Sequence, residues 1–210
     1  MKQAVVGWVR HLDVTAIKGF AVVETDRIAV TDTGVLGTAE FNFEGAPRTG
    51  QFVPGPWDRW ASALAQRPLA LVRSLAPGGA YDASPLTIQS EASLAALGPE
   101  ANGATLDRRR FRMQVTLTGV DTAFAEDDWA GRTASLGSFQ IRLGGPVPRY
   151  VGTEHNPTDL SRTVKVLRTI NRIRGVGHGE FGPGLMFGVY ASVVQPGSIA
   201  VGDELILEGN

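Results

Sequence analysis

Short runs of alternating apolar and polar residues, separated by glycine and proline, dominate the chain. In the clearest run Met113, Val115 and Leu117 alternate with polar residues, so their side chains share one face of an extended strand. The pattern predicts strands at 4–10, 21–23, 27–30, 40–43, 70–74, 110–118, 138–143, 188–194 and 204–207. We therefore expect a mainly β fold with a few helices.

Three segments have helical rather than alternating spacing, and they are 57–66, 91–97 and 160–174. Ser90 and Gly98 are suitable start and stop residues for the second helix, as are Asp159 and Gly175 for the third. The third helix should bury Leu160, Val164, Leu167 and Ile170, and show Arg162, Lys165, Arg168 and Arg172 on another face. Residues 175–184 follow with five glycines, which predicts a mobile loop.

Composition narrows the function classes. The 210 residues contain no cysteine, which excludes disulfides, a thiolate nucleophile and thiolate ligands to a metal. The formal net charge of −1 favours neither nucleic acid nor an anionic membrane as a partner. We expect no signal peptide, no membrane span and a cytoplasmic location, because the N-terminal apolar run is short and lacks a cleavage site. A small-molecule substrate is the expected partner, and the oligomeric state stays open.

Two clusters of polar residues are candidates for chemistry. Residues 108–112 contain four arginines, which can bind phosphate or carboxylate, although Arg108 and Arg109 are more typical of a solvated strand entrance. Arg112 falls inside the alternating run, so we expect it in a barrel interior opposite an anion. The second cluster, Tyr150, Glu154 and His155, lies in one loop before the third helix.

Five segments, in order along the chain, resemble the conserved segments of the MOSC family, which is named for the C-terminal domain of molybdenum cofactor sulfurase. Without the other four segments, the one that contains Lys18 would suggest only an exposed lysine before a turn. The segments are Ala16-Ile17-Lys18-Gly19, Tyr81-Asp82-Ala83-Ser84-Pro85 with Ser90-Glu91-Ala92-Ser93-Leu94, Arg110-Phe111-Arg112-Met113-Gln114, Phe124-Ala125-Glu126-Asp127-Asp128-Trp129, and Pro196-Gly197-Ser198-Ile199-Ala200-Val201-Gly202-Asp203.

The resemblance implies a MOSC-type β-barrel over residues 81–210, preceded by a smaller β-rich N-terminal domain over residues 1–80. It is similar to the amidoxime-reducing branch of the family and its bacterial relatives, which are molybdenum-pterin enzymes acting on N-hydroxylated compounds. By this resemblance the pterin phosphate would lie near Lys18 and Arg112. Further contacts to the cofactor would come from Asp82, Ser84 and Gln114.

The departures from the family pattern concern the metal. The family has an arginine–cysteine pair whose cysteine binds molybdenum, and this chain has Arg149, a candidate for binding the substrate or an anion, and Tyr150 there. A phenol with a pKa near 10 is a poor substitute for a soft thiolate. The family's proline–asparagine and lysine–serine pairs are also replaced, by Met113-Gln114 and Lys18-Gly19. We therefore expect no molybdenum cofactor and no other metal.

Three functions remain open. The first is an enzyme on the MOSC scaffold that acts on a small organic molecule without molybdenum, by isomerisation, elimination, cyclisation or hydrolysis. Tyr150 would then stabilise an oxyanion while His155 or Glu154 moves a proton. The second is a molybdenum-dependent oxidoreductase or sulfur carrier with an unusual ligand. The third is a non-catalytic module that binds an anion through Lys18 and Arg112.

Overall fold

The computed structural model describes residues 4–14, 23–31, 34–35, 50–52, 56–69, 71–74, 81–98 and 106–209. This part of the chain is mainly β, as the sequence predicts, with three α-helices. The strands are β1 (Ala4–Val14), β2 (Val23–Thr25), β3 (Arg27–Thr31), β4 (Gly34–Val35), β5 (Gly50–Phe52), β6 (Val72–Ser74), β7 (Leu86–Ser90), β8 (Val115–Thr118), β9 (Thr133–Leu136), β10 (Phe139–Pro148), β11 (Gly177–Gly179), β12 (Gly182–Gly184), β13 (Met186–Gln195), β14 (Gly197–Ala200) and β15 (Glu204–Leu207). The helices are α1 (Trp57–Ala65), α2 (Glu91–Leu97) and α3 (Val166–Arg174), and none is long and apolar enough to cross a bilayer.

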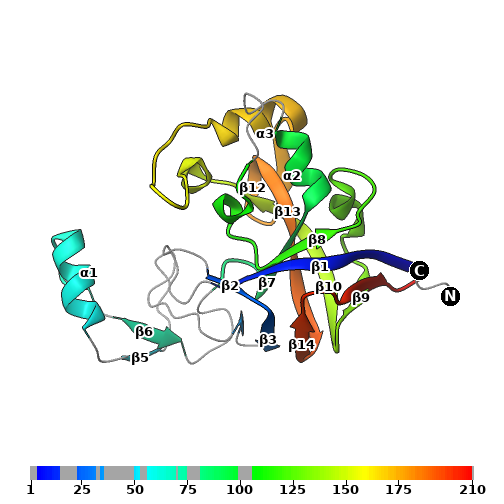
Figure 1. The fold of residues 1–210 in the computed structure, drawn as a ribbon, viewed down its shortest axis with the longest axis horizontal. Coiled ribbons are helices and arrows are strands. Elements are labelled where there is room, and N and C mark those ends of the chain that lie inside the picture. Colours follow the sequence, from blue (N-terminus) through cyan, green and yellow to red (C-terminus); the bar gives the residue numbers. More distant parts are fainter. Residues whose placement is uncertain are drawn as a thin grey trace.

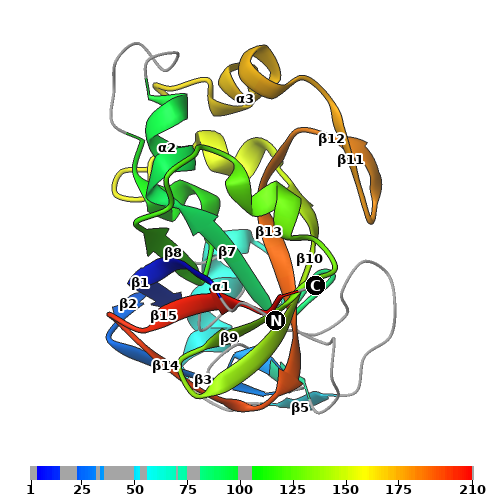
Figure 2. The same cartoon turned by 90° about the vertical axis from the view of Figure 1, so that its right-hand side faces the viewer.

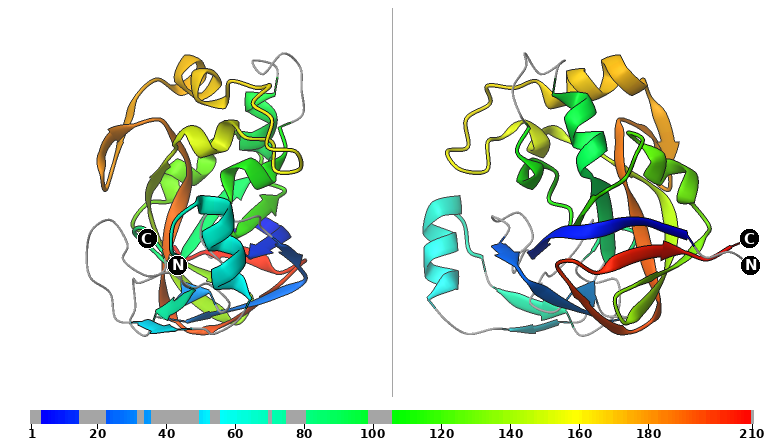
Figure 3. Two further views of the ribbon diagram at one scale, coloured as in Figure 1. Left: turned by 90° about the vertical axis from the view of Figure 1, so that its left-hand side faces the viewer. Right: turned by 45° about the vertical axis from the view of Figure 1, so that its right-hand side comes forward.

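The largest sheet closes into a seven-stranded barrel (Figure 1, Figure 2). Its order is β15, β9, β10, β13, β7, β8 and β1, and pairing of β1 with β15 closes the ring, while β2 pairs with β1 outside it. Figure 3 shows this closure as the blue β1 beside the red β15. All neighbours are antiparallel except β7 and β8, which run parallel. Closure matters because it leaves no unpaired edge in the ring.

Two apolar clusters hold the fold together. The larger one fills the barrel with alternate residues of its strands, such as Phe139, Ile141 and Leu143 of β10. The smaller one lies under α2 and α3, which cover the same end of the barrel in Figures 1 and 2. Tyr190, on β13, belongs to this smaller cluster. The smaller apolar cluster and the helices α2 and α3 therefore lie together at one end of the barrel.

The division into an N-terminal domain and a barrel domain at residue 80 stays a prediction, but β1 from the first range is a strand of the barrel. It pairs with β15 on one side and β8 on the other. The neighbouring β3 pairs with β14 near the C-terminus, and β5 pairs with β6 close to α1 (Figure 1). The predicted strand 40–43 lies outside the described residues.

The third helix is shorter than predicted. It begins at Val166 rather than at residue 160, and its buried residues are Val166, Thr169 and Ile170. The Asp159 carboxylate accepts a hydrogen bond from the Ser161 amide, two residues on, which makes a local turn instead of a helix cap. Leu160 then adopts a φ of 61° and is 72% exposed, so its predicted burial is wrong.

Two further predictions need correction. The predicted strand 110–118 exists only from Val115, because Asp107 caps a 3₁₀ helix, η2 (Arg108–Phe111), through its bond to the Arg109 amide. The predicted mobile loop at 175–184 contains the β11–β12 hairpin, in which Gly177 pairs with Gly184. Gly182, the first residue of β12 after the turn at Glu180 and Phe181, has a φ of 93°, which only glycine adopts readily, so this glycine serves the hairpin geometry.

One glycine of β13 should tolerate no side chain. A Cβ on Gly188 would lie 2.7 Å from the Ile88 carbonyl oxygen and 2.3 Å from Met113 Cε, at a φ of 70°. We expect Gly188→Ala to lower the free energy of unfolding by about 3 kcal/mol in urea titrations. Gly145→Ala is the control, because nothing lies within 4 Å of its Cβ position. Equal stability of the two variants would contradict this packing.

Candidate functional site

A cavity of about 240 Å³ opens at the end of the barrel that the helices cover. Its walls come from the segment before β7, from η2, from the end of β10, from η4 (Val151–Glu154) and from β13. The lining residues are Tyr81, Asp82, Ser84, Thr87, Arg110, Phe111, Arg112, Gln114, Val147, Pro148, Arg149, Tyr150, Gly152, Thr153 and Tyr190. Three of them are arginines and one is a carboxylate, so positive charge predominates.

The cavity brings together most of the residues that the sequence singles out. Six of the nine candidates line it, and they are Asp82, Ser84, Arg112, Gln114, Arg149 and Tyr150. Glu154 and His155 are not among the lining residues. Lys18 lies outside the described residues, so its place at the site stays a prediction.

Arg149 is the best-anchored cation of the site. Its Nε and Nη2 donate to the Phe187 carbonyl at 2.9 and 2.8 Å, and its Nη1 donates to the Phe111 carbonyl at 2.8 Å. A second Nη2 hydrogen meets the Met113 sulfur. All these acceptors are neutral, and burial lowers the pKa of Arg149 to about 10, which leaves it charged at neutral pH. Among the described residues no carboxylate bonds to this fixed positive charge, although Asp82 acts on it electrostatically.

Arg112 has a different position from the one predicted. It follows η2 with a φ of 54°, is exposed, and lies at the cavity wall rather than inside the barrel. The reason is the 3₁₀ helix at Arg108–Phe111, which Arg112 follows directly, so that the strand begins only after the arginine, at Val115. The left-handed backbone at Arg112 directs the chain from η2 toward β8.

Gln114 and Thr87 join the two parallel strands below the cavity. The Gln114 Oε1 accepts a hydrogen bond from the Thr87 amide at 2.9 Å and another from the Thr87 hydroxyl. This fixes the amide group and leaves its Nε2 hydrogens as the donors that a ligand could meet.

Tyr150 stands at the start of η4 and is 65% exposed, so its phenol is accessible from solvent. Its backbone carbonyl accepts from the Thr153 amide at 3.1 Å and the Thr153 hydroxyl at 3.0 Å. Arg110, which is buried, donates to the Glu154 carbonyl at 2.9 Å and ties η4 to η2. The tyrosine is thus carried by a short, well-bonded turn at the mouth of the cavity.

Glu154 is held in an ion pair behind the cavity wall. Its Oε2 lies 2.8 Å from Arg162 Nη2 and 3.8 Å from Lys165 Nζ. These contacts join η4 to the segment before α3. Their cations, Arg162 and Lys165, are two of the four that the sequence predicts on one face of the third helix. The acid–base role of Glu154 stays a prediction, and this geometry favours a structural one.

Glu154→Gln should test that structural role. We expect the free energy of unfolding to fall by about 1 to 2 kcal/mol, because the charge-assisted bond from Arg162 becomes a neutral one. Asp121→Asn makes the same chemical change at an exposed position and should alter stability by less than about 0.5 kcal/mol. Urea unfolding of both variants tests this prediction. Equal stability of the two variants would contradict the structural role of Glu154.

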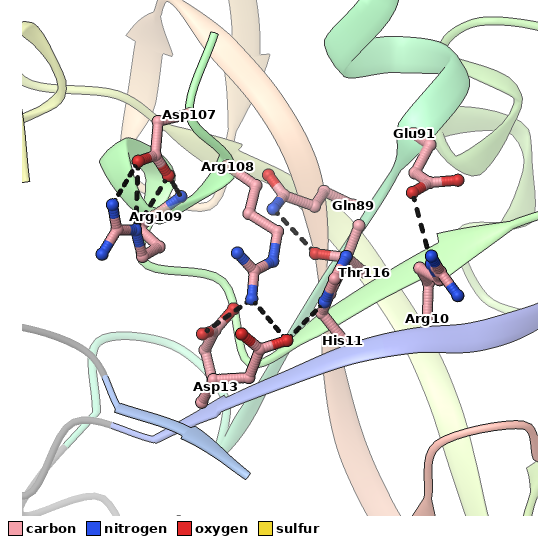
Figure 4. Close-up of polar contacts among 10 residues, drawn as sticks. Arg10, His11, Asp13, Gln89, Glu91, Asp107, Arg108, Arg109 and Thr116 are labelled. Carbon is pink, nitrogen blue, oxygen red and sulfur yellow. Dashed lines mark hydrogen bonds and ion pairs between the residues drawn. The ribbon is translucent and has the colours of Figure 1, made fainter. Parts of the chain in front are cut away.

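The arginines that precede Arg110 do not form an open anion site. Arg108 Nη2 lies 2.9 Å from Glu24 Oε1 and 3.4 Å from Asp13 Oδ1, and Arg109 pairs with Asp107 at 2.6 Å (Figure 4). Burial raises the pKa of Asp13, an effect that Arg108 partly offsets. Carboxylates of the same chain therefore neutralise these two arginines, unlike Arg149.

The family assignment rests on the match of a whole domain. The sequence profile of the MOSC domain matches residues 76–206, which is more than half of the chain. The chain belongs to the MOSC domain family. This region contains all the lining residues of the described cavity. It also contains every strand of the barrel apart from β1 and the last residue of β15.

Curated relatives of this MOSC chain are amidoxime-reducing components. Mitochondrial amidoxime-reducing component 1 of Homo sapiens is 30% identical over 132 residues, which cover 61% of this chain and 38% of that protein. Mitochondrial amidoxime reducing component 2 of Macaca fascicularis is 32% identical over 126 residues, which cover 58% of this chain and 36% of that protein. The matched part thus spans well under half the length of these relatives.

Solved structures support the fold. The YuaD protein of Bacillus subtilis superposes with a TM-score of 0.62 at 11% identity, covering 100% of this chain and 98% of that chain. YiiM from Escherichia coli superposes with a TM-score of 0.52 at 11% identity, covering 100% of this chain and 71% of that one. At such identities the likeness concerns the fold alone.

The donor set of this MOSC domain does not fit the family's molybdenum. The chain has no cysteine, and Tyr150 follows Arg149 where the family pattern has the metal ligand. Within the described ranges, no three histidine or acidic side chains come together in a way that could hold a metal ion. A protonated phenol is a hard and weak donor compared with a thiolate. The residues present therefore do not support chemistry through molybdenum.

Proposed function

We propose that this MOSC domain binds a small organic anion in the cavity at the end of its barrel and moves a proton on it without molybdenum. The observation that carries the proposal is the charge of the lining, where Arg110, Arg112 and Arg149 outnumber the single carboxylate, Asp82. Arg149 matters most, because its guanidinium is held in place by hydrogen bonds to neutral acceptors, with Asp82 acting on it only electrostatically. An anionic ligand would supply the opposite charge.

Two lining residues suit acid–base chemistry in different ways. The Tyr150 phenol can donate a hydrogen bond or a proton to an oxygen that becomes negative during the reaction. Asp82 is exposed at the cavity and is the one carboxylate of its described lining, so it replaces Glu154 and His155 as the preferred proton acceptor. The arginines would hold the anionic end of the substrate between these groups. Whether the net reaction is isomerisation, elimination, cyclisation or hydrolysis stays open.

A second candidate follows from the curated relatives, whose names describe reduction of amidoximes. It would need a molybdenum cofactor, for which the expected ligand is absent from the sequence. A third candidate is a binding module without catalysis, and it is favoured by the ion pair that occupies Glu154. The expected cytoplasmic location stays a prediction alongside all three.

Deuterium exchange from solvent distinguishes proton-transfer catalysis from mere binding. The purified chain is incubated in D₂O with a panel of small carboxylic acids, and incorporation of deuterium is followed by proton NMR and mass spectrometry. We expect catalysed exchange or conversion of at least one acid by the wild type. Binding of these acids without any exchange or conversion would contradict the catalytic part of the proposal and favour the binding module.

A further inference from the structure

Tyr190 lies at the bottom of the cavity on β13, opposite Thr87 of β7 in the register of the two strands. The residue is only 3% exposed, and its ring packs in the apolar cluster with Phe111, Phe187 and Val147. Gly144 leaves room for it on the neighbouring β10, since a Cβ there would lie 3.3 Å from the Tyr190 Cβ. The orientation of the phenol is therefore fixed by packing on several sides.

The Tyr190 hydroxyl has no hydrogen-bond partner within the described part of the chain, although it is buried. Buried polar groups are almost always paired, and an unpaired one at a cavity wall points to a missing partner. Tyr190 itself lines the cavity, and the charges that act on its hydroxyl are those of three other lining residues, Asp82, Arg149 and Tyr150, and of Glu180.

The charges around this phenol keep it protonated. Burial, helped by the negative charges of Asp82 and Glu180, raises the pKa of Tyr190 above its ordinary value, while Arg149 acts in the opposite direction. Because its pKa is raised, the Tyr190 phenol is neutral at physiological pH and can donate a hydrogen bond. The guanidinium of Arg149 favours negative charge near that donor.

We propose that Tyr190 donates its hydroxyl hydrogen bond to a carboxylate oxygen of the ligand and thereby selects small organic carboxylates. This rests on the proposed function insofar as the cavity is the ligand site. No sequence pattern marks the residue, because it lies in a continuous buried run of β13.

A carboxylate suits the donors that Arg149 and Tyr190 offer. A guanidinium has five N–H groups, and four of those of Arg149 are already bonded, which leaves one. That N–H and the Tyr190 hydroxyl are two donors, which match the two oxygens of one carboxylate. The cavity of about 240 Å³ also has apolar walls at Phe111 and Val147, which suit a compact hydrocarbon body.

The test compares sodium benzoate with benzamide, its neutral isostere, and with inorganic phosphate, by calorimetric titration of the full chain. The wild type should bind benzoate more tightly than benzamide or phosphate. Tyr190→Phe should weaken benzoate binding about 10- to 100-fold and benzamide binding by clearly less, because a hydrogen bond to a charged oxygen is stronger than one to an amide carbonyl. The unfolding temperature of the variant should equal or exceed that of the wild type, because the lost hydroxyl bonds to none of the described residues.

The possible outcomes separate this inference from the proposed function. Equal benzoate affinity of wild type and Tyr190→Phe would overturn the role of Tyr190 while the cavity remained a binding site. A strongly lowered unfolding temperature would overturn it too, since it would reveal a structural partner for the hydroxyl. Preference for phosphate, or no binding of benzoate, would overturn the carboxylate class. Selective loss of benzoate without any deuterium exchange would support the inference and remove only the catalytic proposal.

Discussion

Replacement of Arg149 by methionine is expected to lower the free energy of unfolding by about 3 kcal/mol. The side chain binds the carbonyl oxygens of Phe111 and Phe187, which belong to η2 and β13. Without the guanidinium these buried acceptors lose their partners, and each unpaired group costs about 1 to 3 kcal/mol. Urea unfolding monitored by circular dichroism measures the loss.

Arg142→Met is the matched control for this variant. Arg142 is on β10, the strand that Arg149 directly follows, but it is exposed and donates a single bond to the Gly131 carbonyl at 2.9 Å. Its replacement should cost less than about 1 kcal/mol. If Arg149→Met were as stable as Arg142→Met, the cation would not be the fixed anchor of the cavity that the proposal requires. Arg149→Lys should fall between the two, because lysine keeps the charge but cannot contact both carbonyls.

Tyr150→Phe should slow deuterium exchange or substrate conversion by about 100-fold or more, which is the usual contribution of a positioned acid or base. The change removes the phenol hydroxyl and leaves the ring at the start of η4. Because the residue is 65% exposed and its backbone makes the structural bonds, the fold should be unaffected. Rates at saturating substrate are measured for both proteins.

Binding measurements decide how a lost rate is interpreted. Tyr150→Phe should bind benzoate much as the wild type does, while Asp82→Asn should also lose rate. A variant that turns over at the wild-type rate would show that the phenol takes no part in proton transfer. A variant that merely fails to bind would assign Tyr150 to the binding of substrate instead.

The sequence predicts those elements well whose signals are local. The helix at Glu91–Leu97 is confirmed with its Ser90 cap, which accepts from the Ser93 amide at 3.1 Å. The strand at Glu204–Leu207 is confirmed as well, and so is the closed β fold. In both elements, alternation or capping within a few residues is enough to determine the structure.

The failures come from competing turns. Arg112 belongs to the right alternating pattern, but the cap at Asp107 forms a 3₁₀ helix that delays the strand. Asp159 is a good helix cap by type, but its side chain bonds to Ser161 and closes a turn before Lys165. Residue propensities do not distinguish a helix cap from a local turn, because an aspartate carboxylate can accept a backbone N–H bond in either arrangement.

The cavity could be predicted in part. Family resemblance marks Asp82, Gln114 and Tyr150, which segments far apart in the chain bring to one cavity. Tyr190 could not be found this way, because its hydroxyl is noteworthy only once burial and the absence of a partner in the described structure are known. The sequence also could not show that Glu154 forms ion pairs with Arg162 and Lys165, which follow it by 8 and 11 residues.

Independence from molybdenum is the central claim, and metal analysis tests it most directly. The full chain is produced in a host that makes the molybdenum cofactor and is purified without chelators, and its molybdenum is counted by inductively coupled plasma mass spectrometry. The lack of any cysteine predicts far less than one molybdenum atom per chain and no pterin released on denaturation. One molybdenum atom per chain, together with released pterin, would contradict the account.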